Sequence, residues 1–479
     1  MEKSNRASWS GQLAFVLAAA ASAIGLGNLW RFPYLAAQYG GGMFIVIYLS
    51  LVVTLGFTLM LTEIAIGRKT RQSQLTAYSQ LHRRWGFIGV LGTIIPVLIV
   101  PYYCVIGGWV LYYLKTYCQM AFTGAAVMGP AAADSGAFFA SFISSPFAPY
   151  GYGMIFILAC AAVIVLGVKN GIERSNMVMM PILFLMAIAI SVYVISMPGS
   201  MEGVKYYLLP NIKCLEGPDG SFSVALLCKT LLGATGQMFY SLSLAMGIMI
   251  TYGSYLKKKD SIEKCVRRIE ICDTLIALIA GLMIIPVVYL FAVKTGTPVK
   301  EAMSAGPGLM FITLPKVFAS LGAAGAWVGM AFFLLVVFAA ATSAISLYEA
   351  CVAASCDVLK INRKTATFVI GALTLFLSVF SALGYGAWGG IKMFGMQFLD
   401  FFDFITNSIL MPVVAAVTCI FVGWVLKPKT VIDECKCEGQ VFNAKGFYSF
   451  MVRYLAPALM VALLVSEICR ALNIGGWTI

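Results

Sequence analysis

The stretch ASAIGLGNLWRFPYLAAQYGGG, residues 21–42, lies inside an apolar run long enough to cross a membrane. Its centre, SAIGLGN at 22–28, contains two glycines and a β-branched isoleucine, all weak helix formers. This centre ends with the polar Asn28, and the cation Arg31 lies three residues further on. A lipid-buried helix must satisfy its own backbone, so non-helical backbone at this depth has to line a cavity or bind something. The stretch therefore predicts an interrupted transmembrane helix with a role in binding.

The rest of the chain is also too apolar for a soluble domain. Of its 479 residues, 61% are hydrophobic and only 11% are charged. Apolar windows of about 20 residues recur almost to the C-terminus, so we expect an all-α polytopic membrane protein, a single transmembrane domain over 1–479. Eleven spans are predicted, at roughly 12–38, 42–66, 87–122, 151–168, 176–197, 223–255, 268–293, 322–355, 366–385, 395–426 and 447–471.

Basic residues in the short loops predict how the chain is oriented. The clusters GRKTRQ, YLKKKDSIEKCVRR, KINRK and KPK all fall on one side if there are eleven spans and the N-terminus is cytoplasmic. The loops on the other side are longer and less basic. The formal charge of +13 is therefore explained by topology and contact with the lipid bilayer, and a nucleic-acid partner is not expected.

A second weak stretch, FYSLSLAMGIMITYGSY at 239–255, lies in the sixth span. Broken helices in the first and sixth spans are what a five-plus-five inverted repeat gives. The repeats would cover roughly 10–197 and 223–426, with 447–471 as an extra eleventh helix. Small residues also let helices pack closely, and that explanation is an alternative for either stretch alone.

Longer motifs carry a resemblance to a known family. SAIGLGNLWRFPYLAAQYGGGMF closely resembles the first-span signature of the neurotransmitter:sodium symporter family. GQMFYSLSLAMG, GPGLMFITLP, ATSAIS and FLDFFDF follow in the family's order and spacing, so the resemblance covers nearly the whole chain. It implies a sodium-coupled amino acid symporter rather than an enzyme. The chain ends soon after the eleventh span, which resembles bacterial members and implies the bacterial inner membrane.

The resemblance also implies sodium as the coupled ion, with two sites favoured over one. Sodium favours several hard oxygen ligands, as other hard cations do. One site would use the carbonyls of Ala21, Ile24 and Ala339 and the hydroxyls of Thr342 and Ser343. A second site would use Ala23, Asn28, Ser241 and Asp273. The Thr342 and Ser343 hydroxyls could instead bond back to the preceding helical turn.

Asp273 lies deep in the predicted seventh span, where a carboxylate costs about 2.5–3.5 kcal/mol to insert. Many chloride-dependent relatives have Asn at this position and a Ser one turn later. Here the residue one turn on is Ala277. We therefore predict a fixed negative charge that makes transport independent of chloride. Two alternatives are a scaffold ion pair with a nearby cation, and proton coupling through Asp273 or Glu63.

A half-helix N-terminus carries a partial positive charge that suits a carboxylate. By resemblance, the Leu26 and Gly27 amides and the Tyr103 hydroxyl would hold a substrate carboxylate. Gly25 occupies the position where monoamine-transporting relatives carry Asp, so an α-amino acid is favoured. The other predicted binding residues form a mainly apolar pocket suited to a hydrophobic or aromatic side chain: Ser22, Ala23, Ile99, Tyr240, Ser241, Ser243, Met246, Ser343 and Leu347.

Two gates follow from the resemblance. Arg31 and Asp403 would close the outer side. Four residues would close the inner side: Arg6, Asp357, Trp9 and Tyr255. Each charged pair could instead be a static surface ion pair, which contributes little.

Gly171 and Pro181 flank the start of the predicted fifth span, in GIERSNMVMMP. By resemblance, they would let this helix unwind and admit water to the inner sodium, with a plain kink at the helix start as the alternative. These features together predict alternating access. A channel or a substrate-sensing receptor of the same fold is a rival, and a membrane enzyme is disfavoured because one histidine and scattered acids form no catalytic cluster. The oligomeric state is left open.

Overall fold

The structure is a computed structural model that describes residues 7–124, 135–217 and 220–471. Within these ranges the chain forms helices joined by loops and a few isolated bridges, with no extended strand. Two predicted spans are broken, and the other nine are continuous apolar helices. The continuous spans are Gly42–Thr70, Arg83–Thr123, Ala148–Val165, Val168–Ile195, Ile262–Thr295, Ala323–Leu359, Arg363–Leu383, Phe398–Val425 and Lys445–Ala471.

The first span is interrupted as predicted. Helix α1 (Gln12–Ala23) ends at Ile24, and the chain resumes as η1 (Gly27–Arg31) and α2 (Phe32–Gln38) after a bend of 54°. Glycine is required at the bend by close approach. A Cβ on Gly25 would lie 2.7 Å from the Ser343 hydroxyl oxygen, and one on Gly27 would lie 2.6 Å from the Tyr240 ring.

The sixth span is interrupted in a different way. Helix α11 (Val224–Ser241) and helix α12 (Ile248–Ser254) are separated by six residues without regular helix. Three of these residues have left-handed backbone: Ser243 at φ 53°, Ala245 at φ 59° and Gly247 at φ 76°. Two are not glycine, and such residues resist this conformation by roughly 1–2 kcal/mol.

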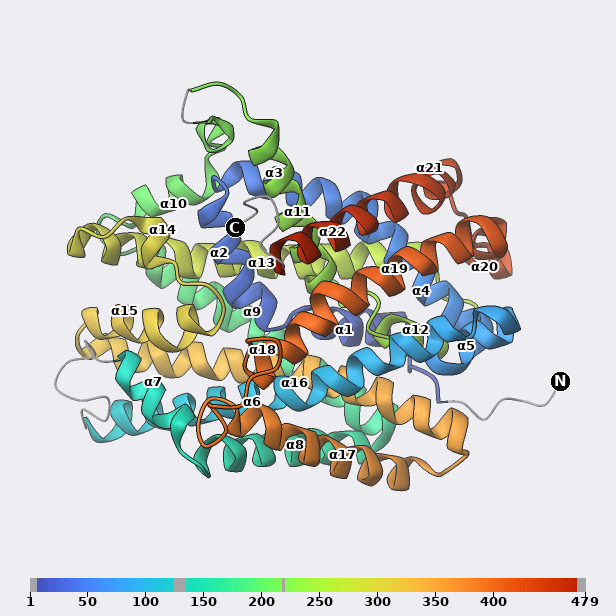
Figure 1. Cartoon of the computed structure of the whole chain (residues 1–479), viewed down its shortest axis with the longest axis horizontal. Coiled ribbons are helices and arrows are strands. Elements are labelled where there is room, and N and C mark those ends of the chain that lie inside the picture. The colour runs from blue at the N-terminus through green and yellow to red at the C-terminus, as the bar shows by residue number, and fades with distance from the viewer. Residues whose placement is uncertain (1–6, 125–134, 218–219, 472–479) are drawn as a thin grey trace.

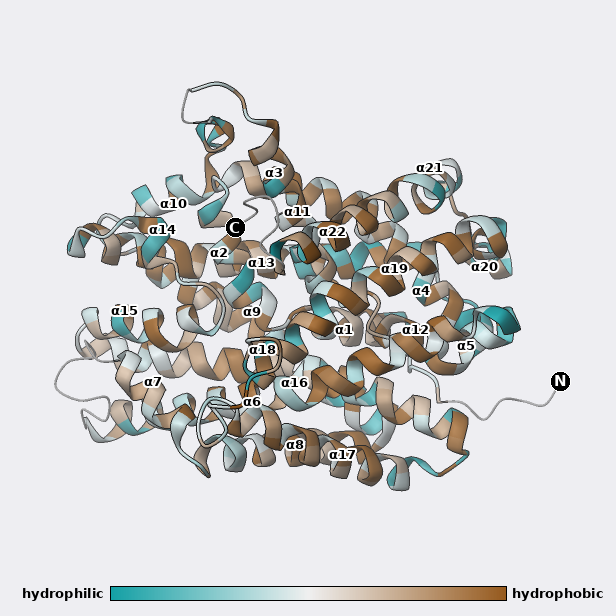
Figure 2. Ribbon diagram, in the orientation of Figure 1, coloured by the Kyte–Doolittle hydropathy of each residue, from teal (hydrophilic) through white to brown (hydrophobic). Residues whose placement is uncertain are grey.

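The long helices run roughly along the longest axis of the molecule and pack side by side (Figure 1). Helices α5 (Gln74–Leu81) and α20 (Lys429–Cys435) lie at one end, each just after a basic cluster. Helices α7 (Ser135–Ser144), α10 (Ser200–Leu208) and α15 (Leu314–Ser320) lie at the other end (Figure 1). Apolar residues dominate the ribbon between the two ends, as Figure 2 shows. This arrangement agrees with the predicted sorting of the basic loops to one side.

The order of spans gives the molecule two halves of equal span number. The first five spans run from Gln12 to Ile195, and the next five from Val224 to Val425. Each set begins with a broken span. The broken spans pack against long continuous helices of both halves: α1 contacts α13 (Ile262–Thr295) and α16 (Ala323–Leu359), and α12 contacts α16 and α4 (Phe57–Thr70).

Candidate ion and solute site between the broken spans

Asp273, on α13, is fully buried and bonds to residues from both broken spans. Asn28 of the first span donates its amide to Asp273 Oδ1 at 2.8 Å. The Ser241 hydroxyl of the sixth span reaches the two carboxylate oxygens at 3.0 and 2.9 Å. The Asn28 amide also contacts the Ser241 oxygen at 3.0 Å. The carboxylate is therefore one point at which the two broken spans are joined.

A further donor to this carboxylate is Tyr48, whose hydroxyl lies 3.4 Å from Asp273 Oδ2. Tyr48 was not predicted, and its position within an ordinary apolar span gives no local signal. Within the described parts of the chain, no Lys or Arg lies within ion-pair distance of Asp273. The nearby Arg267 pairs with Glu270 instead, at 3.3 Å. The scaffold ion pair considered for Asp273 is therefore absent from the described residues.

The second predicted oxygen cluster lies where α16 meets the first break. The Ser22 carbonyl accepts from the Ser343 hydroxyl at 3.0 Å and from the Ser243 hydroxyl at 3.2 Å. Thr342 instead bonds back to its own helix, to the carbonyls of Phe338 at 3.0 Å and Ala339 at 3.1 Å. Ser343 therefore bridges two spans, whereas the Thr342 hydroxyl donates within α16, and its role as a sodium ligand stays a prediction. The other residues predicted to ligate sodium through backbone oxygens are buried: Ala21, Ala23, Ile24 and Ala339.

A small cavity of about 30 Å³ lies between the two breaks. All residues predicted to bind the substrate line it except Ser241, which faces Asp273. No charged side chain is among the lining residues. The Leu26 amide donates to the Tyr103 hydroxyl at 3.4 Å, so the groups predicted to hold a carboxylate are neighbours. Three lining residues were not among the predicted substrate contacts: Gly25, Asn28 and Ile248.

A second, larger cavity of about 390 Å³ adjoins the first at Tyr240, which lines both cavities. Arg31 and Asp403 both line the larger cavity, yet no ion pair within 4.0 Å joins them in the described structure. Asp403 Oδ1 instead accepts from Asn407 at 2.6 Å and from Tyr102 at 3.1 Å. The Arg31 guanidinium carbon lies 5.8 Å from the Tyr240 ring centroid. The predicted outer pair is therefore apart.

The predicted inner gate is densely packed. Trp9 is buried, and its indole N–H donates to the Tyr252 carbonyl at 3.0 Å. Its ring contacts the Tyr252 and Tyr255 rings edge-on, with centroids 5.1 and 6.0 Å away. Asp357 accepts from the Ser73 amide at 2.6 Å, and its predicted partner Arg6 lies outside the described residues.

Sequence reasoning missed a further inner ion pair behind these rings. Glu349 of α16 is fully buried and pairs with Arg363 at the start of α17 (Arg363–Leu383). The Tyr255 hydroxyl donates to the same carboxylate at 2.7 Å. The predicted inner side is thus closely packed, whereas the charged pair predicted for the outer side is apart.

Gly171 and Pro181 lie in wound helix. Gly171 is in a wide helical turn, η5 (Val168–Glu173), and Pro181 is inside α9 (Arg174–Ile195). A Cβ on Gly171 would overlap the Val163 carbonyl. Glu173 holds this turn against the N-terminal segment, accepting from the Ser10 amide at 3.0 Å. Unwinding stays a prediction for another state of the molecule.

Comparisons with known proteins agree with this geometry. The family model described as the sodium:neurotransmitter symporter family matches residues 6–126 and 151–476. The sodium-dependent transporter YhdH of Bacillus subtilis is 32% identical, covering 98% of this chain and 99% of YhdH. The mouse sodium- and chloride-dependent GABA transporter 2 is 26% identical, over 92% of this chain and 74% of that protein. The crystal structure of MhsT in complex with L-phenylalanine superposes with a TM-score of 0.82, at 33% identity, over 97% of this chain and 100% of that one.

Proposed function

Because the chain belongs to the sodium:neurotransmitter symporter family, we propose that it couples sodium entry to the uptake of a hydrophobic or aromatic α-amino acid across a bacterial inner membrane. One observation carries this proposal above the others. The Asp273 carboxylate, which has only neutral partners in the described structure, joins both broken spans beside an uncharged cavity. A buried charge of this kind needs a counter-charge, and sodium is the one that the family relationship supplies.

The substrate class follows from the lining of the cavity. An α-amino acid would place its carboxylate near the Leu26 and Gly27 amides and the Tyr103 hydroxyl, and its amino group near the carbonyls of Tyr240 and Ser241. The contact of the Leu26 amide with Tyr103 places two of these donors together. Its side chain would lie against Ile99, Met246 and Leu347, and a flexible Met suits residues of varied shape. The bound L-phenylalanine of MhsT supports the same class.

The two sodium sites that we propose are those expected from the resemblance. One uses carbonyls of Ala21, Ile24 and Ala339 with the Thr342 and Ser343 hydroxyls. The other uses Ala23, Asn28, Ser241 and Asp273. Two ions crossing a 100 mV potential would supply about 4.6 kcal/mol. Two tenfold gradients would add about 2.8 kcal/mol, so a substrate gradient of about five decades could be held.

We further propose that transport does not require chloride. Chloride-dependent relatives supply an anion near the sodium, and Asp273 would supply that charge here. The residue one turn further along, Ala277, is buried and has no hydroxyl to hold an anion. The fixed carboxylate would make an external anion unnecessary.

The cycle that we propose is alternating access between two repeats, residues 10–197 and 223–426. The arrangement described above would represent the outward-facing state, with a cytoplasmic N-terminus. Closure would bring Arg31 to Asp403 above Tyr240. Inward opening would separate Arg6 from Asp357, release the rings of Trp9 and Tyr255, and unwind the helix between Gly171 and Pro181.

Proton coupling is a second candidate, and one observation favours it. Glu63 is buried on α4 (Phe57–Thr70), and its Oε2 has no hydrogen-bond partner in the described structure. Its other oxygen accepts from the Ala245 amide at 2.7 Å, inside the sixth break. Binding of a proton to Glu63 would therefore be coupled to the conformation of the sixth break.

The test is uptake of a radiolabelled amino acid into proteoliposomes, with the twenty common amino acids as competitors. We expect saturable accumulation against a gradient, driven by sodium, competed best by hydrophobic or aromatic amino acids and unchanged when gluconate replaces chloride. Uptake that persists without sodium and follows a pH gradient would favour proton coupling. Binding without accumulation would indicate a receptor, and flux that only equilibrates would indicate a channel.

A further inference from the structure

A basic pocket lies away from the two breaks, at the N-terminal end of α13. It has a volume of about 630 Å³. One wall is the first turns of α13, with Lys264, Arg267 and Arg268. The opposite wall is the segment 439–443, which precedes α21 (Lys445–Phe450). We call this the basic pocket.

The charges in the basic pocket are unbalanced. Its three cations face a single lining carboxylate, Glu263. Arg267 is engaged by Glu270 at 3.3 Å, but Lys264 and Arg268 are exposed and have no ion pair within 4.0 Å among the described residues. An anion is therefore the complementary ligand.

An apolar stripe continues directly from these cations. Lys264, Arg268, Ile271 and Leu275 recur every three or four residues, so they lie along one face of α13. Ile271 is 58% exposed and Leu275 is 47% exposed. The exposed face thus changes from cationic to apolar within one helical turn. Such a boundary is expected where a spanning helix passes from the headgroup layer into hydrocarbon.

The boundary between cationic and apolar surface on α13 lies next to the second span, which Arg267 contacts. The Arg267 guanidinium lies 3.8 Å from the Phe57 ring centroid and donates to the Val53 carbonyl at 3.4 Å. Val53 is itself largely exposed. The ligand that fits this surface has an anionic head and an apolar tail.

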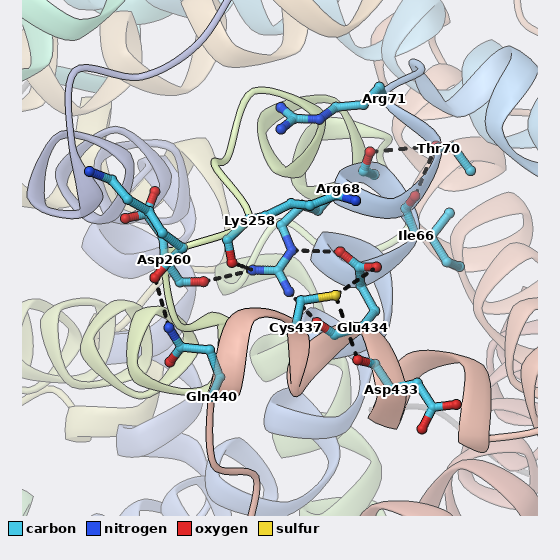
Figure 3. A network of polar contacts seen from close by, with 12 residues as sticks. Ile66, Arg68, Thr70, Arg71, Lys258, Asp260, Asp433, Glu434, Cys437 and Gln440 are labelled. Atoms are coloured by element: carbon cyan, nitrogen blue, oxygen red, sulfur yellow. Dashed lines mark hydrogen bonds and ion pairs between the residues drawn. The ribbon is translucent and has the colours of Figure 1, made fainter. Parts of the chain in front are cut away.

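A network of polar contacts beside the basic pocket joins the loop before α13 to α4 and α20 (Figure 3). Arg68 is fully buried and donates to the Glu434 carboxylate at 2.8 Å and to the Asp260 carbonyl at 2.6 Å. The Gln440 amide donates to the Lys259 carbonyl at 2.7 Å. This last, exposed bond joins the segment 439–443 to the loop before α13.

We propose that the basic pocket binds the headgroup of an anionic phospholipid, with an acyl chain against Ile271 and Leu275. Lys264 and Arg268 contact the phosphate, and the exposed Val441 of the opposite wall contacts the glycerol region. Juxtamembrane cations of this kind attract anionic lipids of the cytoplasmic leaflet. The site is independent of the transported solute, so its failure and that of the transport proposal are separable.

The test is lipid binding to the full-length chain in detergent micelles, followed by native mass spectrometry. Phosphatidylglycerol should be retained at least tenfold more tightly than phosphatidylcholine. Lys264→Gln with Arg268→Gln should abolish that preference. The matched control, Arg83→Gln with Lys364→Gln, removes one Arg and one Lys from exposed sites elsewhere and should preserve it.

Three results would overturn the proposal. They are no preference in the wild-type chain, equal loss in both double variants, and displacement of phosphatidylglycerol by millimolar inorganic phosphate, which would indicate a plain anion site. Thermal unfolding in the same detergent checks that each variant is folded. If the double variant fails to fold, Lys264→Gln and Arg268→Gln are measured singly, and each should weaken phosphatidylglycerol retention about threefold.

Discussion

The first and sixth spans are both interrupted, but the backbone at the two breaks differs. The first break is short and has no residue with positive φ, and its glycines are required by close approach of Ser343, Tyr103 and Tyr240. The second break spans six residues and places two non-glycine residues, Ser243 and Ala245, in left-handed backbone.

The difference shows where each break is encoded. The first break is visible in its own sequence, which has glycine at positions 25 and 27. Glycine is needed there because any side chain would collide with a neighbouring residue. The second depends on a distant carboxylate, since Glu63 of α4 accepts the Ala245 amide at 2.7 Å. A local pattern can therefore predict the first break in detail, while the shape of the second requires the folded molecule.

The largest effect is expected where both breaks meet. Asp273→Asn removes the charge that Asn28 and Ser241 share, so sodium loses its counter-charge. The sodium concentration for half-maximal uptake should rise at least about 30-fold, or about 2 kcal/mol. Asp400→Asn is the control, because Asp400 lies in the outer cavity and bonds to Tyr385 at 2.7 Å. A shift below about threefold in Asp273→Asn would show that the breaks do not share an ion.

A smaller effect should follow from filling the first break. Gly25→Ala places a Cβ 2.7 Å from the Ser343 hydroxyl and 3.1 Å from the Tyr103 hydroxyl. Overpacking of this kind typically costs about 1–3 kcal/mol, so amino acid affinity should fall about tenfold. Equilibrium binding of the labelled amino acid measures it. Gly11→Ala, where a Cβ meets nothing within 4 Å, should bind normally. Unchanged affinity in Gly25→Ala would mean that close approach does not constrain the first break.

A substitution on α4, outside the second break, should destabilise that break. Glu63→Ala leaves the Ala245 amide without its acceptor, and an unsatisfied buried donor costs at least about 1 kcal/mol. The variant should unfold at lower temperature in detergent. Glu63→Gln keeps an oxygen that can accept the amide and should lose less stability. Equal losses in the two variants would show that the carboxyl matters for a reason other than this bond.

The smallest expected effect on stability compares left-handed backbone at Ala245 with regular helix at Ala20. Ala245→Gly relieves left-handed strain while making the unfolded chain more flexible, so the free energy of unfolding should change by less than about 0.5 kcal/mol. Ala20→Gly, in the regular helix α1, should cost about 0.8–1 kcal/mol. Thermal unfolding of the pair gives the comparison. A larger loss in Ala245→Gly than in Ala20→Gly would contradict the strain assigned to the second break.

Span positions could be predicted closely, because long apolar runs have few alternatives in a bilayer. The predicted seventh span, 268–293, lies inside the observed Ile262–Thr295. The fifth was predicted at 176–197, yet its helix begins at Val168, since the wide turn through Gly171 continues the helix rather than breaking it.

For the candidate site, the sequence pointed to residues with a local pattern and not to those defined by contacts between separate helices. Asp273 and the first break are visible as a carboxylate and glycines inside apolar runs. Tyr48, Tyr102 and the Glu349–Arg363 pair were missed, because each acquires its role from a contact between separate helices. Thr342 was grouped with the ion ligands, and its hydroxyl bonds within its own helix.

The central claim is that sodium and an α-amino acid bind as neighbours where the two broken spans meet. Equilibrium binding of radiolabelled L-phenylalanine to the purified chain, in sodium or in potassium at equal ionic strength, tests it most directly. Sodium should raise the affinity at least tenfold, and the amino acid should raise sodium affinity by the same factor, as linkage requires. Saturable binding of equal affinity in both salts would contradict the claim.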